Sequence, residues 1–298
     1  MAIKAIIDPH HHLWDLENYS YPWLCQPGEP VAPIAGSLKP IMTSYSLDDY
    51  KEDAKHWNIV KDVHLDALSA DIQAETRWLQ KMKDETGFPT AIVAHADLEA
   101  DDVEELLTTY AKSKAVRGIR QILNWHPNSE LSFVERNDLL TDPKWLQGFG
   151  LLEKYAFSFD LQLYPHQMLD AAKVARNHQG TTIVLNHTGM PLDRDDAGIK
   201  MWREGMQALA ANPNVNAKIS GLGMVGLEWT TLSVRPFVLE TIDIFGVDRC
   251  MFASNFPVDK IYASFDQIYE TFFELVKDLS ETDQKKMFHD NARRVYRL

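Results

Sequence analysis

The sequence contains only two cysteines, Cys25 and Cys250, among its 298 residues. So few thiols exclude a disulfide-rich secreted scaffold and favour a reducing compartment, although the two could pair with each other. No stretch of 18 apolar residues is present, so we expect no membrane span. The N-terminus lacks an apolar run with a cleavage site and is typical of a strand rather than of a signal peptide. We therefore expect a cytoplasmic protein.

Basic charge is in the minority, with 30 Lys and Arg residues against 43 Asp and Glu residues and a net charge of −13. Because binding of nucleic-acid phosphates requires a basic face, this balance argues against a nucleic-acid partner. A few arginines or lysines inside a pocket are still enough to bind an anionic small molecule. We therefore expect a small-molecule partner, and the oligomeric state stays open, a homo-oligomer included.

A glycine-rich loop is missing after the first expected strand, which argues against an open doubly wound nucleotide-binding sheet, the competing architecture. Short β-rich runs instead alternate with longer helix-like runs, as in a parallel sheet with crossover helices. The eight expected strands are Lys4–His10, Ile59–Leu68, Thr90–Leu98, Val116–Leu123, Phe157–His166, Thr181–His187, Val215–Gly221 and Arg249–Pro257. This alternation predicts an α/β fold, a single (β/α)₈ TIM barrel over residues 1–298.

The expected helices lie between these strands. Ser46 is a suitable N-cap for a helix that runs to about Trp57. The region from Trp14 to Thr43 is different, because it is rich in proline, glycine and aromatic residues, and it predicts a long ordered rim loop over residues 14–43. The further expected helices are Asp71–Glu85, Asp101–Ser113, Asp142–Tyr155, Gln167–His178, Gly198–Ala211, Val234–Phe245, Phe265–Leu279 and a final amphipathic segment Asp283–Val295.

Two histidines separated by one residue, His10 and His12, stand at the end of the first expected strand. Residues two apart in a strand point to the same side, so both imidazoles would face one way while His11 faces the other. Two imidazoles at the carboxyl end of a strand provide ligands for a divalent metal such as zinc. A histidine-rich turn without a ligand is the alternative for this pattern taken alone.

Two further histidines, His166 and His187, end the fifth and sixth expected strands. Catalytic groups of a (β/α)₈ barrel gather at the carboxyl ends of its strands, so we expect these imidazoles to converge with the first pair at one mouth. Strand alternation places Tyr164 and Gln162 on the face of His166.

Two cations occupy comparable positions, Arg120 at the end of the fourth strand and Lys218 in the seventh. A cation at the mouth can pair with a substrate carboxylate, whereas an ordinary salt bridge is the alternative. Arg120, Tyr164 and Lys218 are therefore the candidate substrate-binding residues.

Several motifs in this order resemble the amidohydrolase superfamily, and the resemblance extends over essentially the whole chain. It is closest to the branch of TIM-barrel hydrolases that contains 2-pyrone-4,6-dicarboxylate lactonase, L-fuconolactonase-like sugar lactonases and 4-sulfomuconolactone hydrolase. The motifs are DPHHHLWD, GIRQ, LNHTGMP, KISGL, FASNFPVD and the terminal FHDNARRVYRL.

This resemblance implies a hydrolase of ester bonds, a lactonase that opens the ring of a sugar-acid lactone or of a carboxylated muconolactone or pyrone. It implies one divalent metal, zinc favoured, on His10, His12 and His166. It also implies that His187 orients or polarises the substrate carbonyl. Members of the branch work with or without a metal, so metal-independent catalysis stays open.

The chain departs from the superfamily at the end of the eighth strand, where the usual Asp is replaced by Asn255. An amide cannot take a proton from water, so Asn255 is a candidate catalytic residue that holds water or a metal but is not a general base. Asp259 is expected to face the rim. Asp8 has the strand parity of His10 and is expected beside the site.

Two other functions remain open. Related members decarboxylate aromatic or muconate-type acids with a similar metal centre, although Asn255 counts against that chemistry. A catalytically degenerate barrel that only binds its small molecule is the second alternative, and Asn255 favours it.

Overall fold

Eight strands form one parallel sheet in chain order in the computed structural model, which describes residues 5–25, 31–32 and 34–298. Lys4, the expected start of the first strand, and residues 26–30 and 33 of the rim loop lie outside the described residues. The strands are β1 (Ile6–His11), β4 (Ile59–Leu65), β5 (Ala91–His95), β6 (Val116–Ile122), β7 (Ser158–Gln162), β8 (Ile183–Leu185), β9 (Val215–Ile219) and β10 (Cys250–Phe252).

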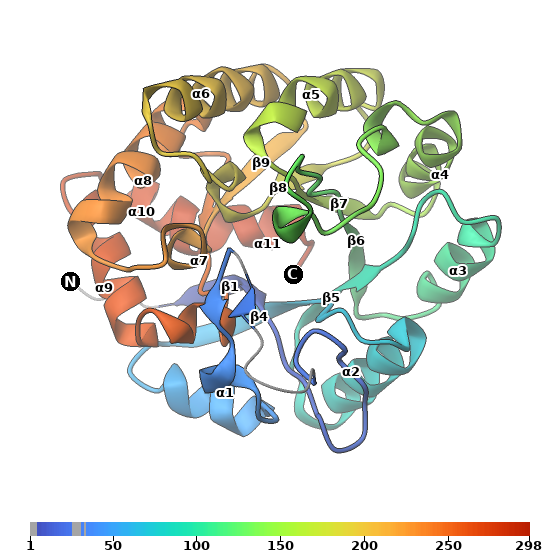
Figure 1. Ribbon diagram of the computed structural model, residues 1–298. Coiled ribbons are helices and arrows are strands. Elements are labelled where there is room, and N and C mark those ends of the chain that lie inside the picture. The colour runs from blue at the N-terminus through green and yellow to red at the C-terminus, as the bar shows by residue number, and fades with distance from the viewer. Residues whose placement is uncertain (1–4, 26–30, 33) are drawn as a thin grey trace.

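The two edges of the sheet, β1 and β10, meet at the carboxyl end. The backbone N–H of Asn255 donates to His10 O at 2.8 Å, and the N–H of His12 donates to Phe256 O at 2.7 Å. These bonds bring the segment after β10 against β1, and the helices surround the sheet in the view of Figure 1. The predicted (β/α)₈ barrel is confirmed.

The helices follow the strands as expected, with shorter bounds at most ends. Ser46 caps α1 in a capping box with Asp49, as the sequence predicts. The expected final helix is divided by a π-helical turn at Lys286–Asp290. The helices are α1 (Leu47–Asp53), α2 (Ile72–Thr86), α3 (Val103–Tyr110), α4 (Pro143–Lys154), α5 (Met168–Asn177), α6 (Asp196–Ala210), α7 (Leu222–Gly226), α8 (Thr231–Phe245), α9 (Phe265–Val276), α10 (Glu281–Lys285) and α11 (Asn291–Val295).

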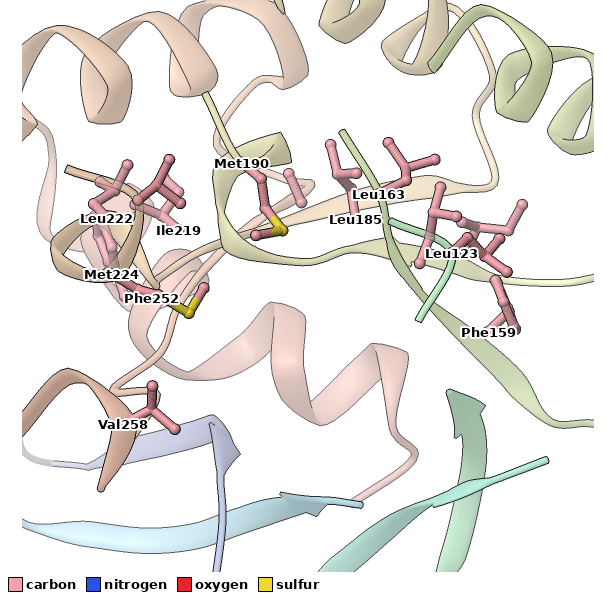
Figure 2. Close-up of a cluster of buried hydrophobic side chains, with 14 of the residues drawn as sticks. Leu123, Phe159, Leu163, Leu185, Met190, Ile219, Leu222, Met224, Phe252 and Val258 are labelled. Carbon is pink, nitrogen blue, oxygen red and sulfur yellow. The ribbon is translucent and has the colours of Figure 1, made fainter. Parts of the chain in front are cut away.

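Two apolar layers form the core of the described residues. The larger layer lies between the sheet and the helices, and Figure 2 shows part of it, including Phe159, Leu185 and Phe252. The smaller layer joins inward residues of the sheet such as Val93 to Tyr296 beyond α11. The C-terminal segment thus helps to fill the barrel interior, and the Tyr296 hydroxyl donates to Asp160 Oδ1 of β7 at 2.8 Å.

The rim loop is fastened by its aromatic residues. The backbone N–H groups of Trp14 and Tyr45 donate to each other's carbonyls at 3.1 and 2.9 Å, and the Trp23 indole donates to Ala67 O at 2.8 Å. A two-stranded ribbon, β2 (Val31–Ala32) and β3 (Gly36–Ser37), lies within the loop. The expected ordered loop therefore docks on the barrel through its described residues.

Cys25 and Cys250 are both free thiols, the first exposed and the second buried, so they do not pair. Within the described residues, no helix is both long enough and apolar enough to cross a membrane.

Candidate active site at the carboxyl end of the barrel

Three of the predicted imidazoles lie in contact at the carboxyl end of the barrel. Nε2 of His10 is 3.3 Å from Nε2 of His12, and the ring centroids of His10 and His187 are 4.6 Å apart. His12 Nδ1 bonds to Leu65 O at 2.9 Å, and His187 Nδ1 pairs with Ser220 Oγ at 3.1 Å. These bonds hold two of the three rings in fixed orientations.

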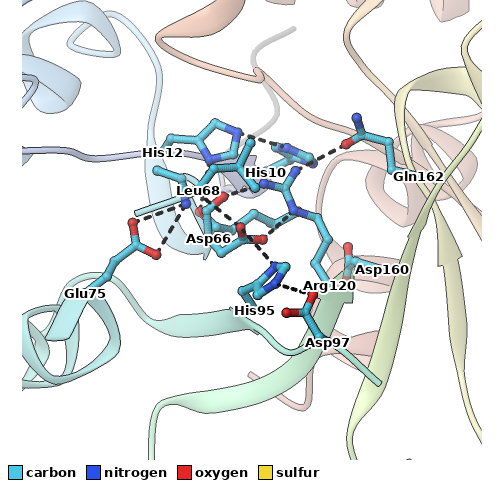
Figure 3. A network of polar contacts seen from close by, with 12 residues as sticks. His10, His12, Asp66, Leu68, Glu75, His95, Asp97, Arg120, Asp160 and Gln162 are labelled. Carbon is cyan, nitrogen blue, oxygen red and sulfur yellow. Dashed lines mark hydrogen bonds and ion pairs between the residues drawn. The ribbon is translucent and has the colours of Figure 1, made fainter. Parts of the chain in front are cut away.

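Two buried ion pairs stand beside the imidazoles, and Figure 3 shows the Arg120 pair among its polar neighbours. Arg120 Nε donates to Asp66 Oδ2 at 2.5 Å and Arg120 Nη1 to Gln162 Oε1 at 3.2 Å. Lys218 Nζ donates to Asp160 Oδ1 at 2.5 Å. Removing one partner of such a pair leaves an uncompensated charge and costs about 3–5 kcal/mol. The two cations are therefore held rigidly, each with its charge balanced.

The imidazoles are held neutral by their surroundings. Burial lowers the pKa of His10 well below its usual value, and Lys218 acts in the same direction. Burial and then Arg120 lower the pKa of His12, and burial, Arg120 and Lys218 lower that of His187. Burial also lowers the pKa of Lys218 to about 8. A neutral imidazole donates one hydrogen bond through its N–H and can accept one, or bind a metal, through its other nitrogen.

Backbone strain concentrates at this end of the barrel. His187 and Asn255 have φ angles of 53° and 55°, in the left-handed region that costs most residues free energy. Gly221, at φ 64°, packs on the His187 ring so closely that a β-carbon would lie 2.5 Å from Nδ1. Only glycine therefore fits at this position without displacing the imidazole.

His166 and Tyr164 do not join the three imidazoles. The expected strand alternation up to His166 is wrong, because β7 ends at Gln162 and Pro165–Gln167 form a 3₁₀ turn. Proline has no N–H for the strand ladder, which favours this early end. His166 is consequently exposed at the rim, and the Tyr164 hydroxyl donates to Leu131 O at 2.7 Å.

Asp8 lies on the other side of the sheet from His10, so its expected parity is wrong. The pairing of β1 with β4 shifts register between Asp8 and His11, which breaks the strict alternation. Asp8 accepts hydrogen bonds from Ser254 Oγ at 2.6 Å and from Tyr50 of α1 at 2.9 Å. It thus supports the barrel closure from outside.

The eighth-strand position is occupied by a buried amide. Asn255 Nδ2 has no hydrogen-bond partner among the described residues. Asp259, which we expected at the rim, is fully buried next to it. Its Oδ2 accepts a hydrogen bond from the N–H of Gly221 at 3.0 Å.

The donor set fits two ligands of a divalent ion. Two nitrogens bound to one tetrahedral ion at about 2.1 Å would be roughly 3.4 Å apart, and the Nε2 atoms of His10 and His12 are 3.3 Å apart. The expected third ligand, His166, is turned to the rim. The part of the chain that the structure describes contains no group of three His, Cys, Asp or Glu side chains suited to a metal.

Three site residues escaped the sequence analysis: Asp66, Asp160 and Ser220. Each acts on a predicted residue from another strand, and contacts between strands cannot be read from one sequence. A local signal existed for two of them, because Asp66 directly follows β4 and Ser220 directly follows β9. Polar residues just after buried strands lie at the mouth of a parallel barrel.

A cavity of about 350 Å³ opens beside the Arg120 pair, between the ends of β5 and β6 and residues 133–139. His95 lines it and lies 3.9 Å from Asp66, the partner of Arg120. Its size is in the usual range for small-molecule sites.

The amidohydrolase family model matches residues 7–298 of this chain. Among similar proteins, the uncharacterised protein y4mH of Sinorhizobium fredii is 44% identical over 300 residues, all of both chains. An L-fucono-1,5-lactonase of Burkholderia multivorans is 28% identical over 98% of this chain and 96% of its own. A solved amidohydrolase of Burkholderia multivorans with bound Zn has a TM-score of 0.83 at 22% identity, covering 99% of each chain. At that identity, the structural likeness concerns the fold.

Proposed function

The chain belongs to the amidohydrolase family, and on that premise we propose that it opens the ring of a lactone by attack of water. The observation that carries the proposal is the contact of His10, His12 and His187 beside the buried cations Arg120 and Lys218. The similarity to an L-fucono-1,5-lactonase supports a sugar-acid lactone as the substrate. An uncharged ring also suits a site in which both cations are already paired with carboxylates.

His187 is the proposed donor to the ester carbonyl. When the Ser220 hydroxyl donates to Nδ1, the ring proton lies on Nε2, which can then donate to the carbonyl oxygen as negative charge develops on it. One such donor contributes about 2.7–4 kcal/mol to transition-state stabilisation. Lys218 stays paired with Asp160 and helps to keep the pKa of His187 low.

Arg120 is the proposed substrate-positioning cation. Asp66 and Gln162 hold its guanidinium group in place. His95, which lies 3.9 Å from Asp66, stands between this group and the cavity beside β5 and β6. A fixed guanidinium loses little entropy when it binds a ring hydroxyl or a carboxylate of the product.

A divalent ion, zinc by the likeness to the Zn-bound neighbour, would be held by His10 and His12. When bound it would polarise the ester carbonyl or lower the pKa of water. We leave His166 out of this set because of its exposed position.

The test replaces both histidines, His10→Ala with His12→Ala, and measures acid release from a panel of sugar lactones. We expect turnover to fall by about 10³-fold or more, because the pair faces the reacting centre. Elemental analysis of the same preparations should show any bound metal in the wild type and less in the variant. Carbon dioxide release, measured in parallel, separates ring opening from decarboxylation.

His56→Ala is the matched control, since His56 is an exposed histidine that bonds Asp266 far from the mouth. It should hydrolyse the same lactones as the wild type does. Undiminished hydrolysis by the double variant would eliminate the proposal.

A further inference from the structure

Asp259 lies on the 3₁₀ turn η6 (Val258–Ile261) and is 0% exposed. One carboxylate oxygen, Oδ2, accepts the hydrogen bond from Gly221, and the Asp259 N–H donates to Asn255 O at 3.0 Å. The other oxygen, Oδ1, has no hydrogen-bond partner among the described residues. A buried carboxylate oxygen without a partner destabilises the fold, so its presence suggests a functional role.

Both neighbours of Asp259 belong to the active site. Gly221 packs against the His187 ring, and Asn255 donates its N–H to His10 O at 2.8 Å. Asp259 is therefore separated by a single residue from the His187 ring and from the backbone of His10, although the rim was its expected place.

The side chains of Asn255 and Asp259 complement each other as a water site. Asn255 Nδ2 is a buried donor and Asp259 Oδ1 a buried acceptor. The amide lies close enough to lower the pKa of the carboxyl group, yet neither atom completes a hydrogen bond among the residues that the structure describes. A water molecule can accept from the amide and donate to the carboxylate at once. The amide itself cannot remove the proton, whereas the carboxylate can.

We propose that Asp259 is a further catalytic residue, whose Oδ1 accepts a proton from the attacking water while the Asn255 amide holds that water. The inference rests on the proposed lactone hydrolysis. The water oxygen forms a bond to the ring carbonyl carbon as its proton passes to Asp259. The ring C–O bond then breaks, and the same proton passes to the departing ring oxygen. The product is a hydroxy acid, and Asp259 returns to its carboxylate form.

The electrostatics of the position suit a base that works near neutral pH. Burial raises the pKa of Asp259 to about 7, against the lowering by the Asn255 amide and by the N–H groups of Gly221 and Met224. Proton transfer is most efficient when the pKa of the base is close to the working pH. The titratable or charged groups on the elements packed around η6 are Lys39 of η1 (Lys39–Ile41), Lys260, Tyr262, Arg194 against α7, and His187 behind Gly221.

The first variant is Asp259→Asn, which keeps the shape and an acceptor for Gly221 but cannot take a proton. On a lactone that the wild type hydrolyses, we expect kcat to fall about 10²–10⁴-fold with little change in KM. We expect kcat/KM of the wild type to rise with pH through about 7, the pKa of Asp259, and we expect this rise to be absent in Asp259→Asn. Asp62→Asn is the matched control, because Asp62 is a buried carboxylate that bonds His11 outside the site, and it should keep that rise.

A second variant distinguishes a catalytic role of Asp259 as proton acceptor from a merely structural role. Asn255→Asp in the Asp259→Asn background returns a carboxylate to the same pair, and Asp tolerates a positive φ about as well as Asn does. We expect about a tenfold or greater recovery of kcat over Asp259→Asn, since a general base is restored. A structural Asp259 would give no such recovery.

The outcomes separate the two proposals. Wild-type turnover in Asp259→Asn would overturn the role of Asp259 and leave lactone hydrolysis standing. A wild type that opens no lactone would overturn the proposed function. In that case, a proton titration of the wild type against Asp259→Asn would show whether the Asp259 carboxylate ionises near pH 7. If the two proteins take up protons alike in that range, the inference about Asp259 is overturned. If Asp259→Asn does not fold, the single variant Asn255→Asp is measured instead. Like-charge repulsion between the two carboxylates must then move the rise of kcat/KM to higher pH, and an unchanged rise rejects Asp259 as the proton acceptor.

Discussion

Gly221 offers the most direct test of how tightly single residues position the site. In Gly221→Ala the new methyl group would lie 2.5 Å from His187 Nδ1, so the imidazole must shift. A misplacement of about 1 Å at a reacting group can cost on the order of 10²-fold in rate. We expect kcat for the lactone to fall by at least tenfold, about 1.4 kcal/mol, as measured by steady-state kinetics.

Gly87→Ala is the control that separates this clash from backbone strain. Gly87 also has a positive φ, 83°, but a β-carbon there meets nothing within 4 Å. Gly87→Ala should lose about 1 kcal/mol of folding stability in urea unfolding, and Gly221→Ala should lose at least as much because of the added clash. Equal kinetics for the two variants would show that the His187 contact is not critical.

At the residue scale, the sequence predicted the positions of the site histidines and cations better than it predicted the side chains that bind them. His10, His12 and His187 were predicted to converge and do so, because each sits at or just beyond the end of a barrel strand. Arg120 and Lys218 also lie at the mouth, yet their carboxylate partners come from other strands and were missed. Such partners depend on strand register, which a single sequence does not contain.

At the scale of elements, the rim loop should control substrate binding rather than chemistry. Trp23→Phe removes the indole hydrogen bond to Ala67 O and keeps most of the ring. Such a bond contributes about 0.5–1.5 kcal/mol, so we expect KM to rise about three- to tenfold with kcat nearly unchanged. Trp229→Phe, which loses an indole bond to Thr271 on α9, is the control and should leave KM alone. A fall in kcat without a change in KM would contradict this role of the loop.

The order of the elements was predictable, whereas irregularities within them were not. Eight β-rich runs alternating with helices permit few folds other than a closed barrel, so the architecture followed from periodicity. The turn at Pro165–Gln167 and the register shift after Asp8 are local departures from strand geometry. Each departure moves the following side chains to another face, and for this reason His166 and Asp8 lie away from their expected places.

At the scale of the whole molecule, the buried titratable groups make stability depend on pH in two opposite ways. The buried His10, His12, His64 and His187 have lowered pKa values, mainly through burial. Below about pH 6.5 the unfolded chain binds protons at these histidines while the folded chain does not, so stability falls as the pH falls. Buried acids with raised pKa values oppose this in the same range, since folding lets them keep their protons.

Above about pH 6.5 the contribution of these four histidines fades, and the acids with raised pKa values lower stability as the pH rises. Burial and the nearby Asp66 raise the pKa of Glu75 to about 8, so the folded chain holds a proton there that the unfolded chain has lost. Stability must then fall as the pH rises, by about 1–2 kcal/mol between pH 6.5 and 8 for this group. The free energy of unfolding of Glu75→Gln, measured in urea, should fall correspondingly less over that interval, whatever the difference between the variant and the wild type at pH 6.5. Glu85→Gln, at an exposed position on α2, should keep the wild-type slope, and parallel slopes for all three proteins would refute the assignment to Glu75.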